Sequence, residues 1–159
     1  LMLRDPTAHA SMLNPPFSLQ GEDAGLRRLG TLTGVLGPYL GNAGWAMRAW
    51  ARQNPDVVTR YLAAYVEGIR FMLAPANADA TVAILAERLR LQPAMARRNL
   101  ALLTDPQSGS AVDGRFDLEG FRNVLRIRAE TLGTWGGTPP APERYHDLGH
   151  WERAVATLS

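Results

Sequence analysis

The sequence predicts a helix-rich α/β fold with two or three strands and about five helices. One observation is the apolar stretch from Tyr39 to Met47, which is short, contains aromatic residues and is interrupted by glycines. These features are typical of a strand whose backbone runs close to another part of the structure. A second observation is the segment that follows, where apolar residues recur at steps of three and four between Val58 and Met72, as on one face of a helix. A strand that leads into a long helix is a common unit and by itself names no function.

The amino-terminal quarter predicts one more strand and a short helix. Residues 8–13 form the strand, which ends at Asn14-Pro15-Pro16 because neither proline can donate a hydrogen bond to a sheet. Residues 18–28 predict a short helix that glycines weaken. The glycines between Gly30 and Gly44 match no phosphate-binding loop, so we interpret them as turn and hinge residues.

The long central helix has a clear start and stop. Asn54 can cap it, Pro55 suits its first position, and Asp56 complements the positive end of the helix dipole. Ala74-Pro75 stops it. Its predicted buried face consists of Val58, Leu62, Tyr65, Ile69 and Met72.

Further helices follow in order. They are predicted after Asn77, from Pro93, from Asp117 to Gly133, and over about residues 148–158. Residues 134–143, rich in Gly and Pro, predict an extended loop on the surface. No linker argues for two independent domains, and there is no internal repeat.

Composition is typical of a soluble globular protein. Apolar residues make up 46% and charged residues 20%, and no apolar run approaches the roughly 20 residues of a spanning helix. Without cysteine, disulfides and thiolate chemistry are excluded. All 17 basic residues are Arg, which the base composition of the source genome explains better than function does; a net charge of +2 does not favour nucleic acid as a partner.

Four motifs together resemble a known family. They are W-A-x-x-N-P-D-x-V from Trp50, A-x-x-E-G-I-R-F at Ala64–Phe71, P-A-N-A-D-A with I-L-A-E-R-L between Pro75 and Leu89, and Y-H-D-L-G-H-W-E-R-A at Tyr145–Ala154. In this order they resemble the carboxy-terminal half of ABC-transporter substrate-binding proteins, the periplasmic binding proteins of type II. The branch in question carries alkanesulfonates, taurine, nitrate or thiamine-pyrimidine precursors.

The resemblance implies a helix-rich part of a two-lobed α/β fold. Residues 1–40 would be the remnant of the second lobe and the crossover, and residues 41–159 the carboxy-terminal part of the first lobe, together in one compact unit. Family members are about twice as long. The chain is therefore expected to be a truncated member or a fragment, an expectation that its start on Leu1 supports, or to complete its fold through another molecule, self-association included.

The implied function is that of a solute-binding component of an ABC importer, located in the periplasm or lipid-anchored outside the cytoplasm. Its two lobes would close on a small organic anion or heterocycle about a hinge near Gly41–Gly44 and present it to the permease. No cofactor, catalysis or nucleic acid is implied. One alternative is a helical interaction or regulatory module derived from the same fold. Another is an enzyme of pyrimidine-precursor synthesis, whose His- and Cys-dependent chemistry has no counterpart here.

Candidate ligand-binding residues are those at the predicted strand ends, where loops of α/β sheets bind ligands. They are Asn14, Pro16, Phe17, Tyr39, Gly41, Asn42 and Trp45. The Asn42 amide can donate to an anion, Gly41 lets backbone N–H groups approach it, and Tyr39 or Trp45 can form a wall. The alternative is that Tyr39 and Trp45 are core aromatic residues beside a turn.

No catalytic or metal site is predicted. His146 and His150 have the four-residue spacing of helical metal ligands, but Gly149 interrupts the geometry and a third ligand is missing. We interpret both as surface histidines, with Asp147 as a helix cap. No Ser lies in a G-x-S-x-G motif, and no paired carboxylates stand in an apolar context.

Overall fold

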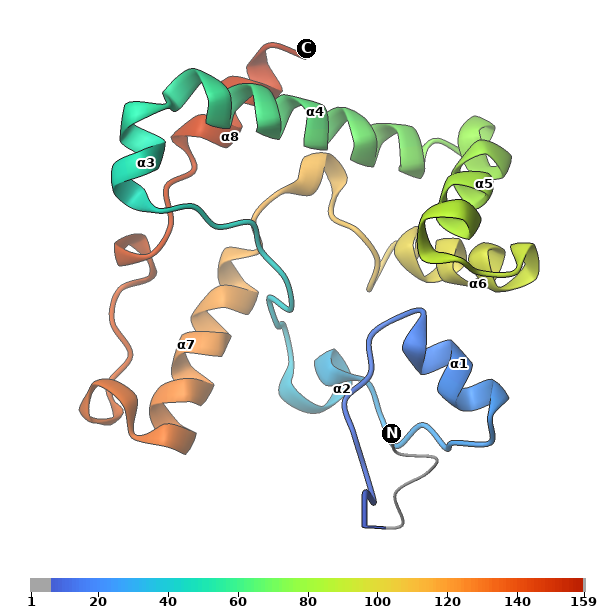
Figure 1. The fold of residues 1–159 in the computed structure, drawn as a ribbon. Helices are drawn as coiled ribbons and strands as arrows, with labels where there is room; N and C mark the ends of the chain where they lie inside the picture. Colours follow the sequence, from blue (N-terminus) through green and yellow to red (C-terminus); the bar gives the residue numbers. More distant parts are fainter. Residues whose placement is uncertain (1–6, 159) are drawn as a thin grey trace. The chain divides into compact units, whose positions relative to one another are not determined.

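The computed structural model describes residues 7–158, and within them the chain is helical or irregular, with no strand (Figure 1). The α-helices are α1 Phe17–Asp23, α2 Leu32–Leu36, α3 Arg48–Gln53, α4 Pro55–Leu73, α5 Ala78–Leu89, α6 Pro93–Leu103, α7 Leu118–Leu132 and α8 Gly149–Ala156. The 3-10 turns are η1 Pro75–Asn77, η2 Val112–Gly114, η3 Thr134–Gly137 and η4 Pro142–Arg144.

The predicted α/β class is therefore wrong: helices account for 63% of the structure, and strands for none of its described part. The stretch from Tyr39 to Met47 has the composition of a strand but contains no helix, turn or bend, and the backbone of residues 39–46 forms no hydrogen bond within the described part of the chain. Residues 8–13 are likewise irregular. A strand is stabilised only by hydrogen bonds to a neighbouring strand, and the described residues offer none.

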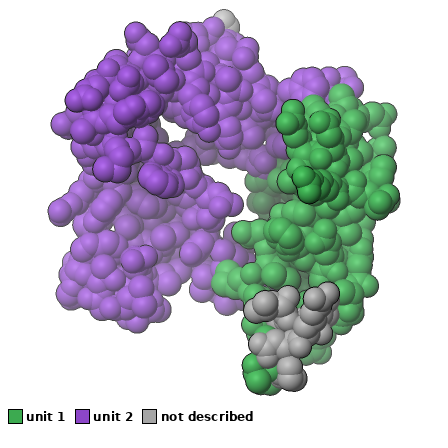
Figure 2. Space-filling view, viewed as in Figure 1, with its two compact units in different colours: residues 1–29, 78–109 green, residues 30–77, 110–159 purple. Residues whose placement is uncertain are grey.

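The chain divides into two compact units, coloured separately in Figure 2: unit 1 is residues 1–29 with 78–109, and unit 2 is residues 30–77 with 110–159. The expected assignment of residues 1–40 and 41–159 to two lobes stays a prediction.

Unit 1 is built on the packing of α5 against α6, with α1 also on α6. Its buried apolar residues are Leu19, Val82, Ala96 and Leu100. Thr81 and Asn99 are buried among them, and the side-chain oxygens of both have no hydrogen-bond partner among the described residues. Arg97 and Arg98 lie on the outer face of α6 and are exposed.

Unit 2 is organised around α4, which packs along α8 and against η2 (Figure 1). Val66 of α4 and Ala154 of α8 are fully buried. The other buried apolar residues of unit 2 are Leu125 and Ala129 of α7. The predicted face of α4 is displaced at one place, because Tyr65 is 49% exposed and the neighbouring Val66 takes the buried position.

Most helix boundaries agree with local signals in the sequence. Pro55 and Pro93 occupy the first turns of α4 and α6. Asp117 caps α7 by accepting a hydrogen bond from the Gly120 N–H at 2.9 Å, and Gly133 closes the helix in the left-handed conformation, at φ 63°.

Three local predictions need correction. Asn54 does not cap α4; its side-chain amide donates instead to the carbonyl of Trp50 at 2.9 Å and so closes α3. Asn77 likewise donates backward, to the carbonyl of Phe71 at 3.1 Å. Residues 134–143 are not one extended loop, because η3 lies within them and η4 begins there.

Candidate functional site

The seven predicted ligand-binding residues lie in two groups, one in each unit. Asn14, Pro16 and Phe17 belong to unit 1, and Tyr39, Gly41, Asn42 and Trp45 to the part of unit 2 between α2 and α3. Neither group stands at the end of a strand, since the described residues contain none. The strand ends on which their prediction depends are therefore absent from the described residues, and their role in binding stays a prediction.

The first group forms the start of α1. The carbonyl of Asn14 accepts a hydrogen bond from the Ser18 N–H at 3.1 Å, so this backbone group initiates a helix instead of ending a strand. Phe17, the first residue of α1, is 63% exposed. An exposed aromatic residue beside a helix start can contact a partner molecule, but Phe17 lines neither of the two cavities described below.

The second group lies on an open segment. Gly41 and Asn42 are exposed, and Trp45 is 88% exposed. The interpretation of Trp45 as a core residue is therefore wrong for the described structure, while Tyr39 is half-buried. The Asn42 amide has no hydrogen-bond partner among the described residues, so nothing in the fold orients it toward a ligand.

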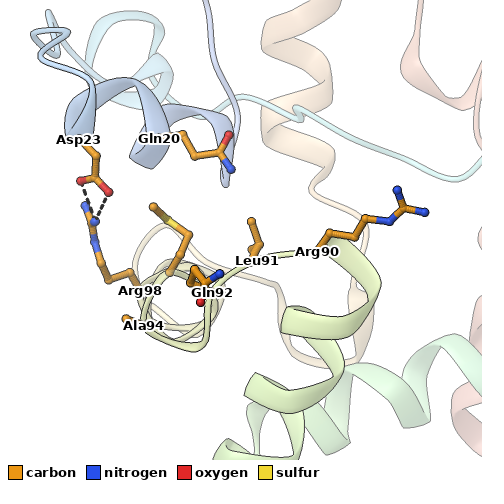
Figure 3. Close-up of a pocket in the computed structure, with 8 residues that line it drawn as sticks. Gln20, Asp23, Arg90, Leu91, Gln92, Ala94 and Arg98 are labelled. Atoms are coloured by element: carbon orange, nitrogen blue, oxygen red, sulfur yellow. Dashed lines mark hydrogen bonds and ion pairs between the residues drawn. The ribbon is translucent and has the colours of Figure 1, made fainter.

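A cavity of about 400 Å³ does lie within unit 1, between α1 and the start of α6 (Figure 3). It is lined by Gln20, Asp23, Arg90, Leu91, Gln92, Ala94, Met95 and Arg98. None of the seven predicted residues is among them. The start of α6 at Gln92-Pro93 can be predicted from the sequence. The cavity cannot, because α1 and α6 are distant in sequence, with Asp23 and Arg98 75 positions apart, and no local pattern indicates that they meet.

Charge in this cavity is largely neutralised. Arg98 Nη1 donates to both carboxylate oxygens of Asp23, at 2.7 and 2.8 Å. Arg90 has a left-handed backbone, at φ 53°, and its side chain points away from the cavity (Figure 3). What remains for a ligand is the amides of Gln20 and Gln92 and the unpaired N–H groups in the first turn of α6. These groups suit a small polar solute held by hydrogen bonds, without a free cation to neutralise an anion.

A smaller cavity of about 280 Å³ lies in unit 2 beside α7. It is lined by Leu36, Pro38, Glu119, Arg122, Asn123 and Arg126. The Asn123 amide donates to the carbonyls of Leu36, at 2.6 Å, and Pro38, at 2.7 Å, so it holds the chain after α2 against α7. Arg126 is paired with Glu130 at 2.7 Å. Sequence reasoning missed Asn123, because a single Asn on a helix carries no signal for two carbonyls 85 or more positions away.

Asp113 in η2 receives hydrogen bonds from two other elements of unit 2. Its carboxylate accepts a hydrogen bond from Arg70 Nε at 2.6 Å, and its carbonyl accepts one from the indole N–H of Trp151 at 2.8 Å. Arg70 also donates to the carbonyl of Leu158 at 2.9 Å. The hydrogen bond from Arg70 lowers the pKa of Asp113, against the opposing effect of desolvation. This cluster joins α4, η2 and the carboxy-terminal helix, so we assign it to stability.

His146 and His150 each contact neighbouring side chains of unit 2. His146 is half-buried with its ring centroid 5.2 Å from that of Phe116, and its Nε2 is buried without a partner. The interpretation of His146 as a surface residue is therefore wrong. His150 contacts Arg153 through Nδ1 at 2.9 Å. Asp147 accepts from the Gly149 N–H at 3.0 Å at the start of α8. Across residues 7–158, no cluster of three or more His, Cys, Asp or Glu could hold a metal ion.

Comparisons with known protein families, curated proteins and solved structures find no match to this chain. No single helix of the described part is long and apolar enough to cross a membrane; only Pro55–Leu73 and Pro75–Leu89 taken together, across the break between them, reach that length and composition.

Proposed function

We propose that this chain is the helical part of the solute-binding component of an ABC importer, and that it binds its solute together with another polypeptide. The observation that supports this is the position of the helices. Each motif of the family resemblance coincides with a helix: Trp50 lies in α3, Ala64–Phe71 within α4, and Pro75–Leu89 spans η1 and α5. The fourth motif, from Tyr145, runs into α8.

The requirement for a second polypeptide follows from what the described residues do not supply. They contain no strand, and far more of their large apolar side chains are exposed than buried. Closure of two α/β lobes about a hinge at Gly41–Gly44 is therefore not a motion of this chain alone. On this proposal the partner supplies the sheet, the helices described here cover it, and the solute is a small organic anion or heterocycle such as a sulfonate, nitrate, taurine or a thiamine-pyrimidine precursor.

A thermal-shift screen tests solute binding. The chain is heated with taurine, ethanesulfonate, nitrate and the aminopyrimidine precursor of thiamine in turn. A solute present at 100 times its dissociation constant adds about 2.7 kcal/mol of stability. For a chain of this size that raises the midpoint by roughly 5–10 °C, at about 2–4 °C per kcal/mol.

Two variants locate any site that the screen finds. Asn42→Ala removes the shift if the predicted residues bind the solute, and Gln92→Ala removes it if the cavity of unit 1 does. A shift that survives both substitutions contradicts both locations. If none of the solutes shifts the midpoint, the isolated chain is not a receptor, and the screen must be repeated with the partner polypeptide once that is known.

A second function is favoured by the same exposed apolar side chains. A helical interaction module without transport would also present residues such as Trp45 and Phe17, which are 88% and 63% exposed, to a protein partner. This function predicts self-assembly or partner binding with no response to any of the solutes, whether or not the partner is present. The two proposals therefore separate when the screen is run on the chain alone and again with its partner.

A further inference from the structure

The segment Tyr39–Met47, called here the 39–47 segment, has an unused capacity for backbone hydrogen bonding. It contains no helix, turn or bend, and the backbone N–H and C=O groups of residues 39–46 form no hydrogen bond within the described part of the chain. All of its residues from Gly41 onward are exposed. A Cβ placed on Gly41 or on Gly44 would meet nothing within 4 Å, so there is open space beside the backbone.

Both ends of the 39–47 segment are nevertheless fixed. At its start, the Asn123 amide on α7 holds the carbonyls of Leu36 and Pro38 at 2.6 and 2.7 Å. Just past its end, Arg48 Nη2 donates to the carbonyl of Arg144 at 2.9 Å. Unit 2 thus holds the segment at two points, with Leu40 close to Gly120 of α7, and presents residues 41–47 to solvent. Because its ends are held, pairing with a partner orders fewer residues than it would in a free loop.

The side chains of the segment are complementary to a second copy of themselves. In an antiparallel pair centred on Ala43, residue 41 stands opposite residue 45 of the other copy, and residue 39 stands opposite residue 47. Trp45 of each copy then covers Gly41 of the other, and Tyr39 faces Met47. A large aromatic side chain across from glycine is a stabilising cross-strand pair, since the ring covers backbone that glycine leaves bare.

We propose that the 39–47 segment is an interface through which two copies of this chain pair as antiparallel strands. Successive strand residues alternate between faces, so Trp45, Tyr39 and Met47 of both copies lie on the same face of the ribbon. An isolated two-stranded ribbon is at best marginally stable in water, so the pair needs additional apolar contacts. Here the shared face gathers two Trp, two Tyr and two Met side chains, of which Trp45 and Met47 are 88% and 71% exposed in the single chain. This inference goes beyond the proposed transport function and does not depend on it.

The first test measures mass in solution. Light scattering over a range of concentrations is expected to give about twice the 17.4 kDa of one chain. In the proposed ribbon Ala43 forms a hydrogen-bonded pair with its own copy, so its N–H donates to the partner strand. Ala43→Pro removes this N–H, which makes no hydrogen bond within the described part of the single chain, so it is expected to give a monomer with an unchanged helical circular dichroism signal. The matched control is Ala111→Pro, at an exposed position of unit 2 whose φ of −64° already suits proline, and it leaves the dimer intact.

The second test uses the absence of cysteine, which makes every introduced thiol unique. In the proposed register, Ala43 is the residue that stands opposite its own copy, about 4.5–5.5 Å away between Cα atoms, which is within disulfide range. Ala43→Cys is therefore expected to cross-link under mild oxidation at least ten times faster than Asn42→Cys, Gly44→Cys or the control Ala111→Cys. Residue 42 of one copy reaches its own counterpart only diagonally, at roughly 7–8 Å.

Three outcomes overturn the proposal. A monomer at every concentration means that the segment serves another polypeptide or none. A dimer that survives Ala43→Pro uses a different surface. Equal cross-linking at all four cysteine positions means that the register is wrong, and this result stands even if Ala43→Pro fails to fold. None of these readouts requires a solute, so their failure is separate from failure of the transport function.

Discussion

Gly114→Ala tests the packing of η2 against α4 more sharply than any other single change. Gly114 has a φ of +60°, and a Cβ built on it would lie 2.6 Å from Tyr65 Cε1 and 3.2 Å from Tyr65 Cδ1. Real Cβ atoms essentially never come within 3.0 Å of a non-bonded heavy atom, so the tyrosine ring must move. Gly133 offers the matched control: it has nearly the same φ, +63°, lies in the same unit, and a Cβ there would meet nothing within 4 Å.

The two substitutions share one cost and differ in the other. Alanine in the left-handed conformation costs about 1–2 kcal/mol, part of which is offset because alanine restricts the unfolded chain. Gly133→Ala is therefore expected to lower the free energy of unfolding of unit 2 by about 1 kcal/mol. At Gly114 the contact with Tyr65 adds an overpacking cost of about 1–3 kcal/mol. Because Tyr65 is 49% exposed and its ring can swing outward, we expect a total of about 2–3 kcal/mol.

Urea unfolding followed by circular dichroism measures both losses. The double variant Gly114→Ala with Tyr65→Ala removes the clash, so it should be destabilised by less than the sum of its two single variants, by about 0.5–3 kcal/mol. Equal losses at Gly114 and Gly133, or additive behaviour in the cycle, would show that η2 does not pack on Tyr65.

Three other predictions concern the same unit. Val66→Ala, at a fully buried position, is expected to cost about 2 kcal/mol from two lost methyl groups and the space they leave, whereas Val57→Ala, 42% exposed on the same helix, should cost less than about 0.5 kcal/mol in urea unfolding. Asp117→Ala removes the cap of α7 and should cost about 1 kcal/mol, while Asp117→Asn, which keeps an acceptor, should be nearly neutral by the same measurement. The hydrogen bond from Arg70 lowers the pKa of Asp113, so the stability it contributes is complete above the ordinary pKa of 3.8 and is lost as the pH falls through the lower pKa of the folded state. When the free energy of unfolding is measured across acidic pH, Asp113→Asn should lack this pH-dependent contribution. The same pH dependence in the variant as in the parent chain would exclude it.

The helices could be predicted because their signals are local. A proline at the first helical position, an aspartate three residues before a glycine N–H, and a left-handed glycine at the end each act within one turn. For this reason Pro55, Pro93, Asp117 and Gly133 were placed correctly. The sequence analysis does not predict α3, because the aromatic residues before it favour a strand, although Arg48–Gln53 contains mostly good helix formers. The Thr31 hydroxyl caps α2 by accepting a hydrogen bond from the Gly34 N–H, but the low helix propensity of glycine makes this helix hard to predict from the sequence.

The candidate site could not be predicted in the same way, because it depended on the strands. A strand exists only when a second strand satisfies its backbone groups, and that second strand is usually distant in sequence. The composition of Tyr39–Met47 indicates a segment able to pair, and says nothing about whether the same chain provides the partner. Likewise the contacts between Asp23 and Arg98 and between Asn123 and Pro38 join residues 75 and 85 positions apart, and no local pattern announces them.

The same difference between local and distant bonding explains why this chain can be helical and still leave much apolar surface exposed. Helices satisfy their own hydrogen bonds, so α4 to α8 can form without a sheet to cover. The apolar surface of the chain is not satisfied in the same way. Among the larger side chains of the described residues only Val66 is fully buried, while Tyr61 on α4 and Trp45 and Met47 before α3 are at least 68% exposed. Exposed apolar area of this kind costs free energy in water, which association recovers. Two of these exposed residues, Trp45 and Met47, stand on the 39–47 segment. The backbone of residues 39–46 is also unpaired within the described part of the chain, so association there satisfies both requirements for these residues at one surface.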